Sequence, residues 1–252
     1  MKTRQHARSI SLPTRTNPLL AQFDENLSSL RGAEATSNSL SSLGDRLGNL
    51  QDLYVSVDDL IQMSHIQQLV QESNKKQADG VLDTYIRILD ACTATKDIFS
   101  QAKHDVQELL SSIRRKKDTT DAHGNYLASR KKAKRPIQKA LKDLKIVKIS
   151  EGVDQVETIS LFNKVQSATI SVLESSLCYV MGTKTHSSLV SKLMRSKSKD
   201  ASKNEFDQMD QALDAQQLGE MELKIQDIEE GLDCLFKHLI KTRVLLLNLL
   251  SY

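Results

Sequence analysis

The sequence predicts an all-α fold, an elongated bundle of long antiparallel helices with a disordered N-terminal tail. Aromatic residues make up only 4% of the 252 residues, and only nine Gly and three Pro interrupt the chain, which favours long helices over a β-sandwich. Between residues 220 and 250, apolar residues recur at alternating steps of four and three, which places them on one helical stripe. The stripe consists of Met221, Ile225, Ile228, Leu232, Leu235, Leu239, Leu246 and Leu249, with Thr242 in its single gap.

A second stripe beside the first widens this apolar face beyond the seam of a two-stranded coiled coil. We therefore expect the terminal helix, about 45 Å long, to have helical neighbours on two sides. Arg243 falls on the second stripe, where its stem lies along the core or its guanidinium pairs with a buried carboxylate. The second stripe consists of Phe236, Ile240, Leu247 and Leu250.

Residues 1–18 predict a disordered basic tail, because they carry four Lys and Arg, no acidic residue and two Pro. Arg8 precedes Ser11 by three residues, a spacing that basophilic kinases favour, so Ser11 and nearby Ser9 are candidate phosphorylation sites. Residues 8–13 also fit the phosphoserine pattern that 14-3-3 proteins bind, which makes a 14-3-3 protein a candidate partner. The alternatives are a chance match in a solvated tail and an organelle transit peptide.

The first two helices are predicted from residue 17 onwards. Asn17 followed by Pro18 is a good helix start, with a capping side chain and Pro at the first helical position. A second helix is expected over residues 36–61, where apolar residues recur at steps of three and four. Gly44 and Gly48 lie on one side of it, where either another helix approaches closely or glycine is merely tolerated.

The middle of the chain predicts two more long helices. Residues 64–80 are expected to form a short helix and a connection, and residues 81–115 a long helix. A loop over residues 118–125 is expected to lead into a basic helix over residues 126–148. Pro136 should kink or break that helix.

The last third of the chain begins with a helix over about residues 156–180 that should stop near Gly182. Residues 183–203 are rich in Ser, Thr and Lys and predict a linker or mobile loop. An acidic helix from about Asn204 should lose its phase just before the terminal helix. We expect residues 19–252 to form a single helical-bundle domain.

The sequence contains no recognisable catalytic arrangement. The six His are scattered, no Cys or His pair has metal-ligand spacing, and there is no Gly-rich phosphate loop. The adjacent pairs Asp58-Asp59 and Glu229-Glu230 should point to different sides of their helices, and we expect such carboxylates to be solvated. We therefore expect a protein that is not an enzyme and uses no cofactor or metal.

The cysteines and the hydropathy indicate an intracellular protein of the cytoplasm or nucleus. Cys92, Cys178 and Cys234 are odd in number and far apart, which predicts reduced, packed thiols. The first residues are polar, so no secretory signal is expected. The most apolar segment, residues 161–181, carries too many polar side chains to span a bilayer.

The best functional signal is a basic segment. Residues 114–148 hold thirteen Lys and Arg against three Asp, whereas residues 200–233 hold eleven Asp and Glu against two Lys. Two clusters of basic residues, separated by twelve residues, suit a bipartite nuclear-import signal. The alternatives are a helical face docked on the acidic region or left in solvent, and binding to an anionic membrane or, less favoured with so few aromatics, to nucleic acid. The candidate residues are Arg114, Arg115, Lys116, Lys117, Arg130, Lys131, Lys132, Lys134 and Arg135.

Several stretches resemble a plant-specific family of unknown molecular function that is related to the BYPASS proteins. They are residues 8–13, 43–54 (LGDRLGNLQDLY), 89–97 (LDAC and ATKD), 129–132 (SRKK) and 231–248 (GLDCLFKHLIKTRVLLLN). The resemblance implies a helical plant protein associated with root and shoot development, without known catalytic residues. We expect a non-enzymatic adaptor or regulatory protein that works through helical interaction surfaces. Pro136 and the polar segment 161–181 depart from the family pattern, which weakens a membrane role inferred from more apolar relatives.

Overall fold

The computed structural model describes residues 17–32, 39–73, 75–115, 119–147, 157–182, 204–209 and 215–251. In these ranges every regular element is an α-helix, which confirms the predicted all-α fold class. The helices are α1 (Pro18–Gly32), α2 (Leu40–Ile61), α3 (Ser64–Gln71), α4 (Lys75–Arg114), α5 (Thr119–Ile146), α6 (Glu157–Met181), α7 (Glu205–Met209) and α8 (Ala215–Leu250). The predicted tail, up to residue 16, and the predicted loop over residues 183–203 lie outside the described ranges.

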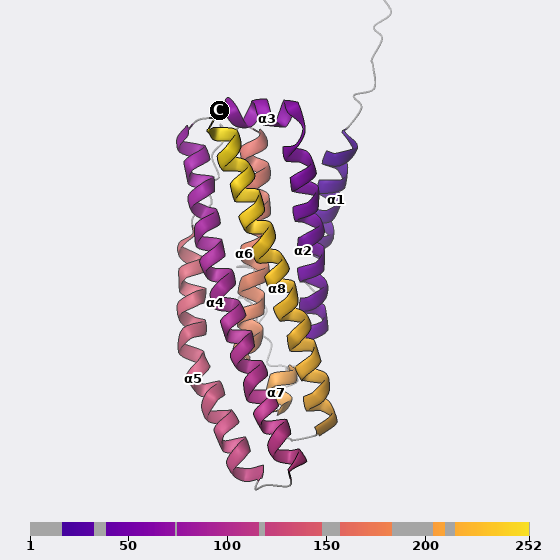
Figure 1. Cartoon of the computed structure of the whole chain (residues 1–252), viewed down its shortest axis with the longest axis vertical. Helices are drawn as coiled ribbons and strands as arrows, with labels where there is room; N and C mark the ends of the chain where they lie inside the picture. The colour runs from indigo at the N-terminus through magenta and orange to yellow at the C-terminus, as the bar shows by residue number, and fades with distance from the viewer. Residues whose placement is uncertain are drawn as a thin grey trace, which may run out of the picture.

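The long helices lie side by side along the long axis of the molecule, and the short α3 lies across one end (Figure 1). α8 packs against both α4 and α2, α5 packs against α4 and α6, and α1 packs against α2. Consecutive long helices run in opposite directions, as predicted. α2 and α8 run parallel, since Gln51 hydrogen bonds the Gly231 carbonyl and Asp58, further along α2, pairs with Lys241, further along α8.

Two helix starts are set by side-chain caps. The side-chain oxygen of Asn17 accepts a hydrogen bond of 3.0 Å from the backbone N–H of Leu19, so α1 begins where predicted. α2 begins at Leu40, about one turn later than predicted. The reason is that the Ser39 hydroxyl accepts a hydrogen bond of 3.1 Å from the backbone N–H of Ser42 and caps the helix there.

The predicted loop over residues 118–125 is wrong, because α5 already begins at Thr119. Tyr126 is buried, and the His123 ring stacks on it with a centroid distance of 6.4 Å. This packing outweighs the turn preference of the His-Gly-Asn sequence. Pro136 does not break α5, which is continuous through it.

Two other helices begin earlier than predicted, α4 at Lys75 and α8 at Ala215. The added turn of α4 buries Ala78, and the added turn of α8 buries Leu218 completely. Each added turn is thus stabilised by contact with the core. α8 is one continuous helix, so the interruption of helical phase that was predicted before the terminal helix does not occur within it.

The first stripe of the terminal helix forms the centre of the core. Leu235 and Leu239 are fully buried, and all other members of the stripe are buried except Leu249, which is half-buried. Thr242, in the gap of the stripe, is fully buried as well. Arg243 is half-buried, which fits the predicted arrangement with its stem along the core.

α6 lies in the interior although its sequence is unusually polar. Gln166, Thr169 and Ser176 are fully buried, and each donates a hydrogen bond to a backbone carbonyl, Gln166 to that of Val81 at 2.9 Å. These bonds explain how a segment too polar for a bilayer packs inside a protein core. The helix ends, as predicted, at Gly182, whose φ of 73° favours glycine.

Candidate functional site

The predicted basic patch is divided between two helices. Arg114 and Arg115 are exposed at the end of α4. The members on α5 are Arg130, Lys131, Lys132, Lys134 and Arg135. Lys116, Lys117, Ser9 and Ser11 lie outside the described residues.

Arg130 is a packing residue rather than part of an exposed patch. Its side chain is half-buried and donates a hydrogen bond to the carbonyl of Val180 at the end of α6. Its guanidinium carbon also lies 4.7 Å from the centroid of the Phe206 ring in α7, a cation–π contact. Arg130 therefore joins α5 to α6 and α7.

Five other basic residues of α5 form a single exposed strip. Lys131, Lys134, Arg135, Lys142 and Lys145 are all exposed and recur at helical spacing, so they share one side of α5. We call this strip the α5 basic face. It extends the predicted basic segment beyond residue 135 and omits Arg130.

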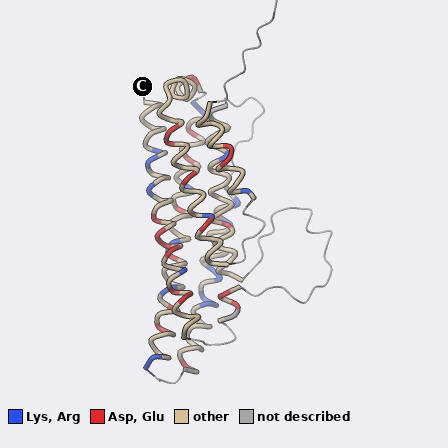
Figure 2. Tube along the Cα trace, turned by 90° about the vertical axis from the view of Figure 1, so that its right-hand side faces the viewer, with Lys and Arg blue, Asp and Glu red and all other residues tan. Residues whose placement is uncertain are grey.

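Two described carboxylates of the acidic region over residues 200–233 pair with α4. Lys96 of α4 lies 2.5 Å from Asp233, and Lys103 of α4 pairs with Glu229. The basic segment thus contacts the acidic region through Arg130 and Phe206, whereas the carboxylates of Asp233 and Glu229 pair with α4. Figure 2 shows acidic and basic residues interspersed along the helices, so the charge blocks of the sequence do not become opposite poles.

Two of the carboxylates predicted to be solvated are buried. Asp58 is 3% exposed and Glu229 is 7% exposed, whereas their neighbours Asp59 and Glu230 are exposed. Adjacent carboxylates thus point to different sides, as predicted, but one of each pair points inward. Each buried carboxylate is stabilised by a lysine, Asp58 by Lys241 and Glu229 by a lysine of α4.

A polar cluster surrounds Asp58 where α2 meets α8. The ammonium of Lys241 lies 2.8 Å from one carboxylate oxygen of Asp58, and the Thr242 hydroxyl donates a hydrogen bond of 3.3 Å to the other. His238 Nδ1 lies 3.8 Å from the first oxygen. The His238 ring stacks on Tyr54 with centroids 6.0 Å apart, and burial raises the pKa of Tyr54, which keeps its phenol neutral.

This cluster does not form a catalytic arrangement. The Thr242 hydroxyl bonds to Asp58 and not to His238, so no nucleophile is paired with a base. Thr242 is also fully buried, so its hydroxyl does not face the solvent. The cluster is a polar connection between α2 and α8. Periodicity could not identify it, since Asp58 follows directly after a member of the apolar stripe of α2, Val57.

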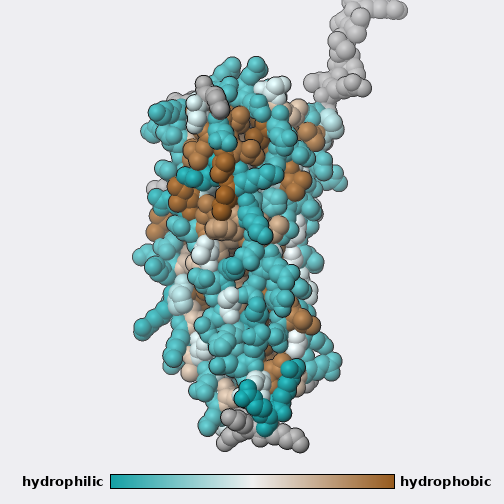
Figure 3. Space-filling model, in the orientation of Figure 1, coloured by the Kyte–Doolittle hydropathy of each residue, from teal (hydrophilic) through white to brown (hydrophobic). Residues whose placement is uncertain are grey.

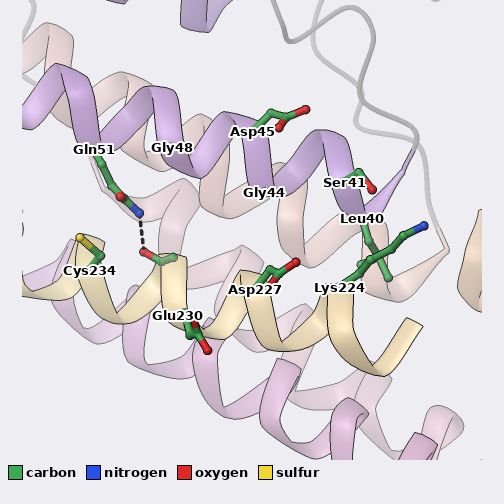
Figure 4. A pocket seen from close by; sticks show the side chains of 11 residues that line it. Leu40, Ser41, Gly44, Asp45, Gly48, Gln51, Lys224, Asp227, Glu230 and Cys234 are labelled. Atoms are coloured by element: carbon green, nitrogen blue, oxygen red, sulfur yellow. Dashed lines mark hydrogen bonds between the residues drawn. The ribbon is translucent and has the colours of Figure 1, made fainter. Parts of the chain in front are cut away.

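A groove of about 440 Å³ lies between α2 and the first half of α8 (Figure 4). Asp45 from α2 and Asp227 and Glu230 from α8 contribute carboxylates, and Lys224 lies at one end. Gln51 bridges the two helices through its hydrogen bond to α8. The lining suits a cationic side chain, and it contains no paired base and nucleophile.

The glycines of this groove have different surroundings. A Cβ added at Gly44 or Gly48 would meet no atom within 4 Å, so these two do not mark a close helix approach. A Cβ at Gly231 would lie 3.2 Å from the Leu47 side chain, so α8 approaches α2 closely there. Gly44 and Gly48 therefore fit the alternative in which glycine is merely tolerated, and the close contact between the two helices is at Gly231.

A larger groove of about 760 Å³ lies between α4 and α5. Its lining combines small or cyclic side chains, among them Ala133 and Pro136, with charges of both signs, among them Asp97, Lys132 and Lys139. Lys132 therefore lines a groove of mixed charge and does not extend the α5 basic face.

An exposed apolar surface is formed by α4 and the second half of α8. Ile86, Ile240 and Val244 are 41%, 43% and 46% exposed, and Leu89 and Phe236 are half-buried beside them. We call these five residues the α4–α8 patch. Figure 3 shows hydrophobic side chains gathered over these helices in the upper half of this face. α8 has helical neighbours on two sides, as predicted, yet its second stripe is only partly covered.

Within the described residues Cys92, Cys178 and Cys234 form no disulfide, and Cys92 is buried. None of the described helices is long and apolar enough to cross a membrane. Within the ranges that the structure describes, no group of three or more His, Cys, Asp or Glu could hold a metal ion.

Comparison with known proteins gives one family match. Residues 46–249, from the middle of α2 to the end of α8, match the family model described as Protein BPS1. No curated protein and no solved structure matches the chain.

Proposed function

The chain belongs to the BPS1 family, and we propose from this membership that it is a non-enzymatic adaptor or regulatory protein of plant root and shoot development. The membership confirms the resemblance to BYPASS-related proteins found in the sequence. We also propose that the protein is intracellular and that it acts in the cytoplasm or nucleus through contacts with other proteins.

The α4–α8 patch is the observation that carries this proposal. Ile86, Ile240 and Val244 are large apolar side chains that are each more than two fifths exposed, and they lie on two helices that pack against each other. A contiguous apolar patch with a polar surround is typical of a protein interaction surface. Its position on two rigid helices suits recognition of a partner without rearrangement of the core.

The surroundings of the titratable residues support a non-enzymatic function. The carboxylates of Asp58 and Glu229 are buried and paired with lysines, an arrangement that stabilises helix contacts. The open groove between α2 and α8 has carboxylates but no imidazole or paired hydroxyl in its lining. A 14-3-3 protein that binds phosphorylated Ser11 would be a further partner, through the N-terminal residues.

Quantitative capture of partners from root extract tests the proposal. Ile240→Asp with Val244→Asp should lose bound proteins that the wild type retains, because charges would enter an apolar interface. Leu223→Asp is the matched control, since Leu223 lies on the same helix, is 64% exposed and is outside the patch. Equal capture by all three proteins would contradict a function that depends on this patch.

A second candidate function is docking on an anionic membrane, originally predicted through residues 114–135. The α5 basic face favours it, because Lys131, Lys134, Arg135 and two further lysines share one exposed side. Co-sedimentation with phosphatidylserine vesicles should fall with salt and be lost when Lys131, Lys134 and Arg135 become Ala. Arg130 should be left unchanged, because its substitution would disturb packing. Binding that is equal on neutral vesicles would contradict this candidate.

A further inference from the structure

The α4–α8 patch still needs an occupant. We propose that a second copy of this chain covers it, which makes the protein a symmetric dimer whose two patches face each other. This inference rests on the proposed function, in which the patch is an interaction surface. The alignment of α4 with α8 and the charges beside the patch both favour this arrangement.

The contacts between α4 and α8 fix the alignment of the patch. The thiol of Cys92 lies 3.6 Å from the carbonyl oxygen of Leu232, and the two helices run in opposite directions. Ile86 precedes Cys92 on α4, while Ile240 and Val244 follow Leu232 on α8, so all three lie toward the same end. The patch is therefore one surface that straddles the seam between two helices.

The charges on the two sides of this seam have opposite signs. Asp83 and Asp90 are exposed on α4, three residues before and four residues after Ile86, and so lie on its side of the helix. Lys237 and Lys241 are exposed on α8, each three residues before an exposed member of the patch. The edge along α4, where the exposed Arg87 lies between the two carboxylates, therefore carries a net negative charge, and the edge along α8 is basic.

This arrangement is self-complementary under one particular symmetry. A two-fold axis parallel to the helices places α4 of one copy on α8 of the other, so the apolar centres meet and each acidic edge meets a basic edge. Asp90 and Lys237 both lie near the level of the contact between Cys92 and Leu232, so they face each other across the interface. A two-fold axis across the helices would instead bring like charges together.

Sedimentation equilibrium of the full-length protein, from low to high micromolar concentration, tests the dimer. We expect a wild-type dimer whose dissociation constant rises by at least about tenfold in Ile240→Asp and in Val244→Asp. Leu223→Asp should dimerise like the wild type. Circular-dichroism melts should show that all three variants remain folded, because the substituted side chains are exposed.

Charge reversal tests the proposed symmetry. Asp90→Lys and Lys237→Asp should each weaken the dimer, and the double variant should regain affinity, because the pair is restored across the interface. Additive losses in the double variant would overturn this geometry.

A monomeric wild type at every concentration, or a dimer that the Ile240 and Val244 variants leave unchanged, overturns the inference. Partner capture then separates it from the proposed function. The wild type can be a monomer while Ile240→Asp still captures fewer proteins from root extract than the wild type does. That result means that a different protein occupies the patch. In that case the dimer is wrong and the proposed function stands.

Discussion

Asp58 of α2 and Lys241 of α8 form an ion pair of 2.8 Å between two helices that are far apart in the sequence. The two partners differ in exposure, because the Asp58 side chain is 4% exposed and that of Lys241 is 57% exposed. The buried carboxylate thus depends on an ammonium that reaches in from the surface, with the Thr242 hydroxyl as its second donor. The pair fixes the alignment of the parallel helices α2 and α8.

Removal of either partner should destabilise the fold. Asp58→Asn and Lys241→Met are each expected to lower the free energy of unfolding by about 1–3 kcal/mol, the second because it leaves a buried carboxylate without its cation. The double variant should cost less than the sum of the two. Urea unfolding followed by circular dichroism measures these values. Asp59→Asn, at the exposed neighbour, is the control, and additive losses would contradict coupling between Asp58 and Lys241.

Charge in the core stripe should unfold the bundle. Leu239 is fully buried, so Leu239→Asp should cost several kcal/mol by placing an unpaired carboxylate in the core. Leu223→Asp on the same helix should change stability by no more than about 0.5 kcal/mol. Thermal melts of the two variants make the comparison, and a folded Leu239→Asp protein would show that the stripe is not the core.

The glycines of α2 and α8 should respond to alanine in opposite ways. Gly44→Ala and Gly48→Ala should each stabilise the protein by up to about 1 kcal/mol, because the added Cβ meets nothing and helix propensity improves. Gly231→Ala should destabilise it, because the Leu47 side chain would have to move. Melting temperatures measure both effects, and a stabilised Gly231→Ala protein would contradict the close approach of α8 to α2.

Stability should fall at alkaline pH through the thiol of Cys92. Burial raises the pKa of Cys92 from 9.0 to about 12 in the folded protein, so folding favours the protonated thiol. This contribution is fully present below pH 9 and is lost at up to about 1.4 kcal/mol per pH unit as the pH rises toward 12. Urea unfolding at pH 7 and at pH 11 measures the loss.

A Cys92→Ala variant is the control for this pH dependence. The variant lacks the thiol, so its stability should fall less than that of the wild type between the two pH values, even though burial also raises the pKa of Tyr54. Parallel loss in both proteins would show that Cys92 does not contribute.

The sequence predicted the elements whose periodicity is strong. The terminal stripe, the Asn17 start of α1 and the end of α6 at Gly182 all follow from local rules, namely apolar spacing, capping and a left-handed glycine. The starts of α5 and α8 were missed because long-range packing decides them. Tyr126 and Leu218 are buried, and this burial outweighs the local turn signals.

The candidate site was less predictable than the fold. Charge alone identified the basic residues. Which of them are held in packing contacts and which are exposed depends on the neighbouring helices, which the sequence does not show. Arg130 donates a hydrogen bond to the Val180 carbonyl and contacts the Phe206 ring, whereas Lys131 remains exposed. The α4–α8 patch could not be predicted, because the second stripe of α8 looks the same in sequence whether or not another helix covers it.

Root growth in plants that lack the endogenous protein tests the central claim, that this protein works through the α4–α8 patch. Roots should be restored by the wild type, by Leu223→Asp, and by the variant with Lys131, Lys134 and Arg135 changed to Ala. They should not be restored by Ile240→Asp with Val244→Asp, expressed at an equal level. Full restoration by that patch variant would contradict the account.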